Sequence, residues 1–197
     1  MARSSLGPPT YEDAALRAII FFDGPVGLGI GRSSSQDTVP EVSGFALNIA
    51  REMTMPQPIP YLAFDGNCAD AMRFYAKVFD GKLNMLTFGQ SPMSEQTPKD
   101  ALNRIMHARL ALEGNGSLYA GDSPPGVPYQ GIHGVSITLN YDAVGAAERV
   151  FNALADGGKV TMAFGPTFWA KRFGMVTDKF GCPWIVNGEM IDVPMQG

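Results

Sequence analysis

The sequence has few of the residues that cross-link small proteins or bind metals. Its 197 residues include only two Cys and two His. Cys68 and Cys182 are far apart and belong to no C-x-x-C motif, so neither a disulfide framework nor a zinc knuckle is predicted. We expect both thiols to stay reduced, as is usual in the cytoplasm.

Long apolar runs and a strong net charge are also missing. The longest apolar stretch near the start, residues 18–22, is far shorter than a membrane span or a signal-peptide core. Fifteen Lys and Arg stand against 19 Asp and Glu, and the basic residues are scattered along the chain. These features predict a cytoplasmic protein with no membrane segment and no nucleic-acid partner.

Residues 1–57 differ in composition from the rest of the chain, and contain none of its His, Cys or Trp. A glycine-rich run over residues 24–31 follows an apolar segment, as in some nucleotide or methyl-donor loops. Such a loop needs a helix N-terminus directly behind the glycines, whereas a serine-rich stretch and Pro40 follow here. We therefore predict a flexible loop in a loosely packed N-terminal extension, and we expect a chain that begins at Met53 to fold.

An internal repeat begins near residue 59. Residues 61–82 align with residues 137–159, and each segment reads as a strand, a polar turn, an amphipathic helix, an Asp-Gly stop and a Lys. Apolar residues recur three and four positions apart in both helices, which predicts one buried face for each. They are Ala71, Phe74, Tyr75 and Val78 in the first helix, and Ala147, Val150, Phe151 and Leu154 in the second.

Three strand-like runs follow each predicted helix. They cover residues 83–88, 105–112 and 117–120 in the first copy, and 160–164, 173–177 and 184–186 in the second. Each copy is therefore a β-α-β-β-β module, and the fold class is α+β. Because one helix covers only one face of a four-stranded sheet, we expect the two modules to associate around a shared cavity. The domain should span residues 58–190, with modules at 58–123 and 131–190 and a tail at 191–197.

Two motifs of the repeat region resemble a known family. They are Pro-Tyr-Leu-Ala-Phe-Asp-Gly-Asn-Cys-Ala-Asp-Ala at residues 60–71, and the stretch from Thr167 to Trp184 that contains Phe-Trp-Ala-Lys-Arg-Phe-Gly. Together with the paired modules, they resemble the PhnB-like branch of the vicinal oxygen chelate superfamily, which includes glyoxalases, ring-cleaving dioxygenases and bleomycin-resistance proteins. The resemblance implies a glyoxalase-like cup that holds a small molecule, and we expect a homodimer.

The metal-dependent members of this superfamily hold a divalent ion with His or Glu at four strand positions, two in each module. Here Pro60 or Tyr61 stands at the start of the first strand, and Ile185 lies where the last ligand would fall. Neither Tyr nor Ile replaces an imidazole or carboxylate as a ligand, so tight divalent-metal binding is not expected. The remaining candidates for a nonstandard ligand set are His107, Asp122 and His133.

Each of these three residues also has an ordinary structural interpretation. His107 alternates with Arg109 on the side of its strand opposite Ala108, which predicts a pocket or surface position. His133 lies between glycines and is expected in a loop. Asp122 precedes a Ser-Pro-Pro-Gly segment, where an Asp commonly turns or caps the chain; the alternative is a carboxylate at the cavity mouth.

The expected ligand site combines aromatic walls with a few polar groups, as small-molecule pockets usually do. Arg109 or Lys171 would orient an anionic group, Arg109 being better suited to a bidentate carboxylate or phosphonate. The predicted lining is His107, Arg109, Tyr119, Phe168, Trp169, Lys171 and Trp184.

Three functions are compatible with this sequence. The first is a metal-free protein that binds a small molecule between the modules, an anionic molecule being one option. The second is a metal-dependent lyase, isomerase or dioxygenase with a nonstandard ligand set. The third, methyl transfer, lacks the strand-loop-helix context that a methyl-donor site requires. The sequence leaves open whether the protein is an enzyme and whether it uses a cofactor.

Overall fold

The computed structural model describes residues 58–124 and 126–194. The expected N-terminal extension, its glycine-rich run and the Met53 start lie outside the described residues. In chain order, the elements are β1 (Tyr61–Phe64), α3 (Cys68–Phe79), β2 (Lys82–Thr87), β3 (Ile105–Ala111), β4 (Ser117–Asp122), β5 (Ile137–Tyr141), α4 (Val144–Ala155), β6 (Lys159–Gly165), β7 (Ala170–Thr177) and β8 (Pro183–Met190). Short 3-10 turns lie between β2 and β3 and between β3 and β4.

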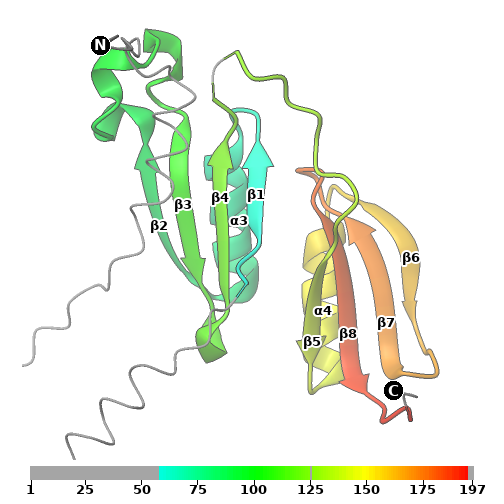
Figure 1. Ribbon diagram of the computed structural model, residues 1–197. Helices are drawn as coiled ribbons and strands as arrows, with labels where there is room; N and C mark the ends of the chain where they lie inside the picture. The colour runs from blue at the N-terminus through cyan, green and yellow to red at the C-terminus, as the bar shows by residue number, and fades with distance from the viewer. Residues whose placement is uncertain (1–57, 125, 195–197) are drawn as a thin grey trace, which may run out of the picture.

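The strands form two four-stranded sheets with the same topology (Figure 1). The first sheet has the order β1-β4-β3-β2 and the second β5-β8-β7-β6. In each sheet the first and last strands of the module pair in parallel, and the other neighbours are antiparallel. The prediction of two β-α-β-β-β modules in an α+β fold is confirmed.

Some predicted boundaries were wrong in informative ways. Strand β7 begins at Ala170, so Lys171 and Arg172 lie in a strand rather than in the expected loop. In the Asp-Gly stop of α3, the residue with left-handed backbone angles is Asp80, with φ of 51°. Gly81 is needed for space, because a Cβ there would lie 2.7 Å from Leu110 Cδ1 and 2.9 Å from the Ala111 carbonyl oxygen.

Both helices lie on the same side of their sheets, behind them in Figure 1. Buried residues from α3 and from the second module join in one hydrophobic core. The Trp184 ring lies 5.2 Å from the Tyr75 ring and 5.3 Å from the Phe79 ring, measured between centroids. The helix-covered sides of the two modules therefore meet, and among the described residues no helix covers the opposite face of either sheet.

A buried carboxylate connects the two modules at this junction. Asp178, in the turn between β7 and β8, is only 4% exposed. Its Oδ2 accepts hydrogen bonds of 2.7 Å from the Tyr75 hydroxyl and from Trp184 Nε1, while its Oδ1 accepts from the backbone N–H groups of Phe180 and Cys182. Since Tyr75 belongs to the first module, Asp178 links α3 to the turn of the second.

Within the described ranges, neither helix has the length and apolar character needed to cross a membrane.

A candidate ligand-binding face on the first sheet

The open face of the first sheet carries a cation among aromatic rings. Ala108 and Leu110 point into the core and are completely buried, so the alternating residues His107 and Arg109 lie half-buried on the opposite face. Strand pairing places Arg109 opposite Tyr119, and Tyr119 beside Tyr61. These residues form one row across β3, β4 and β1.

The side chains of this row contact one another and His107, the next open-face residue of β3. His107 meets Tyr119 edge-on at 5.1 Å and lies 5.9 Å from Tyr61, both measured between ring centroids. Arg109 Cζ lies 5.9 Å from the centroid of the Tyr119 ring. Arg109 forms no ion pair with another described residue, and its buried Nε has no hydrogen-bond partner there. The guanidinium is therefore a donor group available to an external acceptor.

The Tyr61 side chain extends from β1 across β4 toward β3. Its hydroxyl donates to the Met106 carbonyl oxygen at 3.4 Å. Burial, and secondly the nearby Cys68 thiol, raise the pKa of Tyr61 to about 12, so the phenol stays neutral at physiological pH. A Cβ on Gly121 would lie 2.7 Å from the Tyr61 hydroxyl, so this ring position requires glycine there.

A small hollow of about 140 Å³ adjoins Tyr61 on this face. It is lined by Tyr61, Ala63, Phe88, Met106, Gly121, Asp122, Ser123 and Pro124. Of these, Phe88 and Met106 belong to a second small core with Met93. The sequence does not predict this hollow, because Phe88 reaches it through a turn whose course the strand pattern leaves undefined.

The open face of the second sheet has a different character. The Trp169 ring stands edge-on to both Phe168 and Phe173, with centroids 4.6 and 5.1 Å away. Lys171 forms an ion pair with Glu189, so its charge is already partnered. Asn187 donates from Nδ2 to Asn140 Oδ1 at 2.9 Å, and its own Oδ1 has no partner among the described residues.

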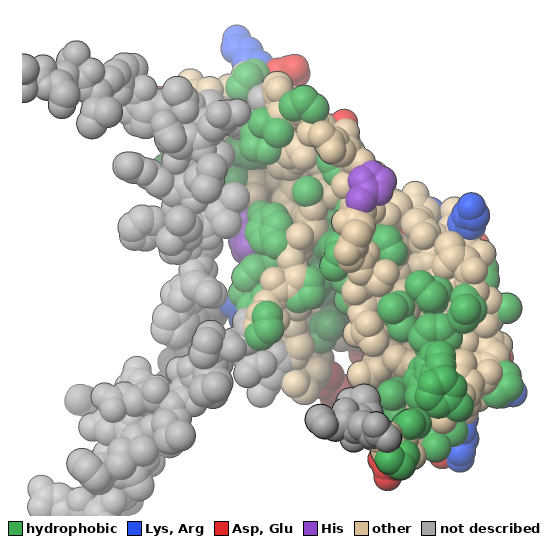
Figure 2. Space-filling view, turned by 45° about the vertical axis from the view of Figure 1, so that its right-hand side comes forward, with side chains coloured by type: hydrophobic (Ala, Val, Ile, Leu, Met, Phe, Trp, Pro, Cys, Tyr) green, Lys and Arg blue, Asp and Glu red, His purple; other side chains and the backbone are tan. Residues whose placement is uncertain are grey.

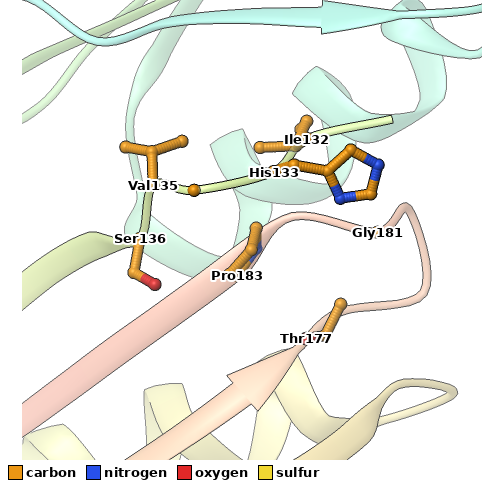
Figure 3. Close-up of a pocket in the computed structure, with 8 residues that line it drawn as sticks. Ile132, His133, Val135, Ser136, Thr177, Gly181 and Pro183 are labelled. Carbon is orange, nitrogen blue, oxygen red and sulfur yellow. The ribbon is translucent and has the colours of Figure 1, made fainter. Parts of the chain in front are cut away.

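The structure differs from the expected cup in the position of Trp184 and in where the hollows lie. Trp184 is 1% exposed and packs on the helix-covered side, because its strand position alternates with the open-face residue Ile185. Three hollows in the described surface have been characterised, and none of them is lined by the open faces of both sheets. One lies where the linker that precedes β5 meets the β7–β8 turn, and it includes His133 and Ser136 (Figure 3).

The three candidate metal ligands do not converge. Among the described residues, no group of three or more His, Cys, Asp or Glu side chains is placed to hold a metal ion. Asp122 is buried and accepts hydrogen bonds from the backbone N–H groups of Gly66, Cys68 and Ile105, as expected for a capping residue. His133 lies exposed in the linker, its Nε2 hydrogen-bonded to the Gln130 carbonyl oxygen. This donor set does not fit the metal centre of the superfamily's metal-dependent members.

The cysteines are structural residues of the core. Both are completely buried and remain free thiols. Burial is the main reason that the pKa of the Cys68 thiol is raised, and it also raises the pKa of Cys182 to about 12. Neither thiol is therefore an activated nucleophile.

Comparisons with known proteins agree with this architecture. A family model described as 3-demethylubiquinone-9 3-methyltransferase matches residues 56–187. The crystal structure of protein PA1353 from Pseudomonas aeruginosa is 51% identical in sequence, covers 68% of this chain and 97% of its own, and has a TM-score of 0.63. Protein YjdN of Escherichia coli K12 is 36% identical over 138 residues, which are 65% of this chain and 92% of YjdN.

The PhnB protein from Bacillus cereus shares the fold at lower identity. It is 23% identical, covers 67% of this chain and 98% of its own, and has a TM-score of 0.54. The methyl transfer in the description of the family model is a family label, and it identifies no site on this chain. By the family match, the sequence relatives and the two-module fold, the chain belongs to the PhnB-like family of the vicinal oxygen chelate superfamily.

Proposed function

We propose that this protein binds a small anionic molecule on the open face of the first sheet, without a four-ligand metal site. Arg109 is the observation that supports this proposal most directly. Its guanidinium lies over Tyr119 beside His107, and no carboxylate of the described residues pairs with it. A planar guanidinium with unused donors suits a carboxylate or phosphonate, which can accept two parallel hydrogen bonds.

A panel of small carboxylates and phosphonates, followed by calorimetry on the strongest binder, tests the proposal. Arg109→Gln should weaken binding about tenfold to a hundredfold, because a hydrogen bond to a charged group is worth about 1.5 to 3 kcal/mol. His107→Gln should weaken it less, since it removes the ring that contacts Tyr119 and leaves the Arg109 guanidinium in place.

Arg73→Gln provides a matched control for the loss of a positive charge. Arg73 lies on α3, on the other side of the sheet, and among the described residues its charge pairs with the exposed Asp70. Its replacement should leave the affinity unchanged. Unchanged affinity in both the Arg109 and the His107 variants, with unchanged stability, would place the site elsewhere, and the absence of any millimolar binder in the panel would refute the proposal.

We also propose that two copies associate through the apolar surface of the second module. Figure 2 shows hydrophobic side chains gathered on this module, and its exposed apolar residues include Val160, Met162, Phe168 and Met190. Exposed patches of this kind often mark protein interfaces. Sedimentation equilibrium should therefore give twice the chain mass of 21.1 kDa, whereas a monomer at micromolar concentration would contradict the dimer.

The second candidate function is a metal-dependent enzyme with a nonstandard ligand set, and His107 on the open face is the observation that favours it. On our proposal, protein purified without chelator holds no stoichiometric nickel, zinc, iron or manganese. The reason is that Pro60 or Tyr61 stands at one expected ligand position and Ile185 at another. Elemental analysis combined with thermal melting in each divalent ion tests this. One equivalent of bound metal that His107→Gln removes would favour the enzyme instead.

A further inference from the structure

The hollow beside Tyr61 is apolar although a carboxylate lies at its edge. Both oxygens of Asp122 are already occupied: Oδ1 accepts from Gly66 and Cys68, and Oδ2 accepts from Ile105. The remaining walls are mainly aromatic and aliphatic, including Phe88, Met106 and Pro124. A ligand group that enters the hollow therefore finds hydrophobic contacts and few free hydrogen-bonding partners.

The size of the hollow limits what it can hold. Its volume is about 140 Å³, and an apolar protein cavity of about 150 Å³ is known to accept benzene. A single six-membered ring or a short branched alkyl group therefore matches its size.

The walls of the hollow are already in place. Phe88 and Met106 are 2% and 5% exposed and pack with Met93. The turn that carries Phe88 is held by a reciprocal pair of hydrogen bonds, in which the Thr87 hydroxyl accepts from the Gln90 N–H and the Gln90 side chain accepts from the Thr87 N–H. A preformed hollow binds at a lower entropic cost than one that must be ordered by its ligand.

Tyr61 joins this hollow to the cationic end of the row. Its ring lines the hollow and also lies 5.9 Å from His107, which in turn contacts Tyr119 beneath Arg109. An apolar recess and an available guanidinium are thus connected by a continuous aromatic surface on one face of the sheet.

We infer that the ligand is an aryl anion, a phenyl-sized ring attached to a carboxylate or phosphonate. The ring occupies the hollow beside Tyr61, and the anionic group pairs with Arg109. This inference rests on the proposed function and defines its ligand class.

Calorimetry with phenylphosphonate and methylphosphonate on the full chain tests the inference, and phenylacetate and acetate repeat the comparison for carboxylates. Each pair shares its anionic group and differs in the ring. Phenylphosphonate should bind at least about tenfold more tightly, because the ring surface that contacts the apolar walls is removed from water. Phenylacetate should likewise bind more tightly than acetate, if the ring rather than the phosphonate group causes the difference in affinity.

Filling the hollow should remove this preference. Ala63 is an exposed residue of β1 that lines the hollow, and Ala63→Leu should bring the affinity for phenylphosphonate down to that for methylphosphonate. Ala163→Leu makes the same exchange at an exposed position of β6, outside the hollow, and should leave the preference intact. Thermal melting of both variants checks that the fold is retained.

The outcomes separate the two proposals. If neither phosphonate nor carboxylate pair binds, the proposed function fails and this inference fails with it. If the small anions bind but the ring adds no affinity, or Ala63→Leu leaves the preference unchanged, the inference alone is overturned and Arg109 keeps its proposed role.

Discussion

Asp178→Ala is expected to lower the free energy of unfolding by about 4 kcal/mol. The substitution leaves the Tyr75 hydroxyl and Trp184 Nε1 without their acceptor in the core, and it also removes the acceptor of two backbone N–H groups. Each buried donor left unpaired costs about 1 to 3 kcal/mol. The sum is reduced wherever water enters the space that the carboxylate vacates.

Urea unfolding followed by circular dichroism measures this effect. Asp156→Ala, at the exposed C-terminal end of α4, removes the same charge and should change stability by less than about 0.5 kcal/mol. Tyr75→Phe should cost an intermediate amount, because Trp184 still donates to the carboxylate. A loss below about 1 kcal/mol in Asp178→Ala would show that the link between the modules contributes little to stability.

Asp122→Ala should cost about 3 kcal/mol, because this carboxylate supplies a cap that the local sequence lacks. The side chain of Asn67, at the start of α3, makes no capping hydrogen bond, and Asp122 instead accepts from the N–H groups of Gly66 and Cys68. It also accepts from the Ile105 N–H at 2.7 Å, which joins β4 to the start of β3. The substitution therefore leaves three backbone donors without an acceptor.

The matched control for this loss is Asp100→Ala, in an exposed 3-10 turn. It should be neutral to within about 0.5 kcal/mol. Asp122→Asn should fall between the two, because one oxygen remains to accept. Equal stability of Asp122→Ala and the control would mean that water replaces the carboxylate at all three donors, and that the tertiary cap is dispensable.

The sequence by itself determined the repeated architecture. The aligned segments 61–82 and 137–159 predicted one amphipathic helix in each copy, and α3 and α4 lie within these segments. The reason is that periodic burial in a helix and alternation in a strand are local patterns, which side-chain spacing records directly. The same alternation separated His107 and Arg109 from the buried Ala108 and Leu110.

The tertiary structure alone decided which residues meet across the modules. Trp184 was expected to line the cup. The face on which a strand residue packs depends on the register of the strand. In the structure, the Trp184 side chain packs against Tyr75 and Phe79 in the core. The sequence predicted that Lys171 could bind an anionic ligand, but in the structure Lys171 forms an ion pair with its cross-strand neighbour Glu189.

The candidate site shows the same division. The sequence predicts Arg109, His107 and Tyr119 as residues of the ligand site, because each lies in a predicted strand where buried and open-face positions alternate. Tyr61 was considered only because it stands near a position where a metal ligand is expected, and the hollow beside it was not predicted. That hollow is assembled from β1, β3, β4 and the Phe88 turn, and contacts between residues so distant in the chain come from packing, which no local pattern encodes.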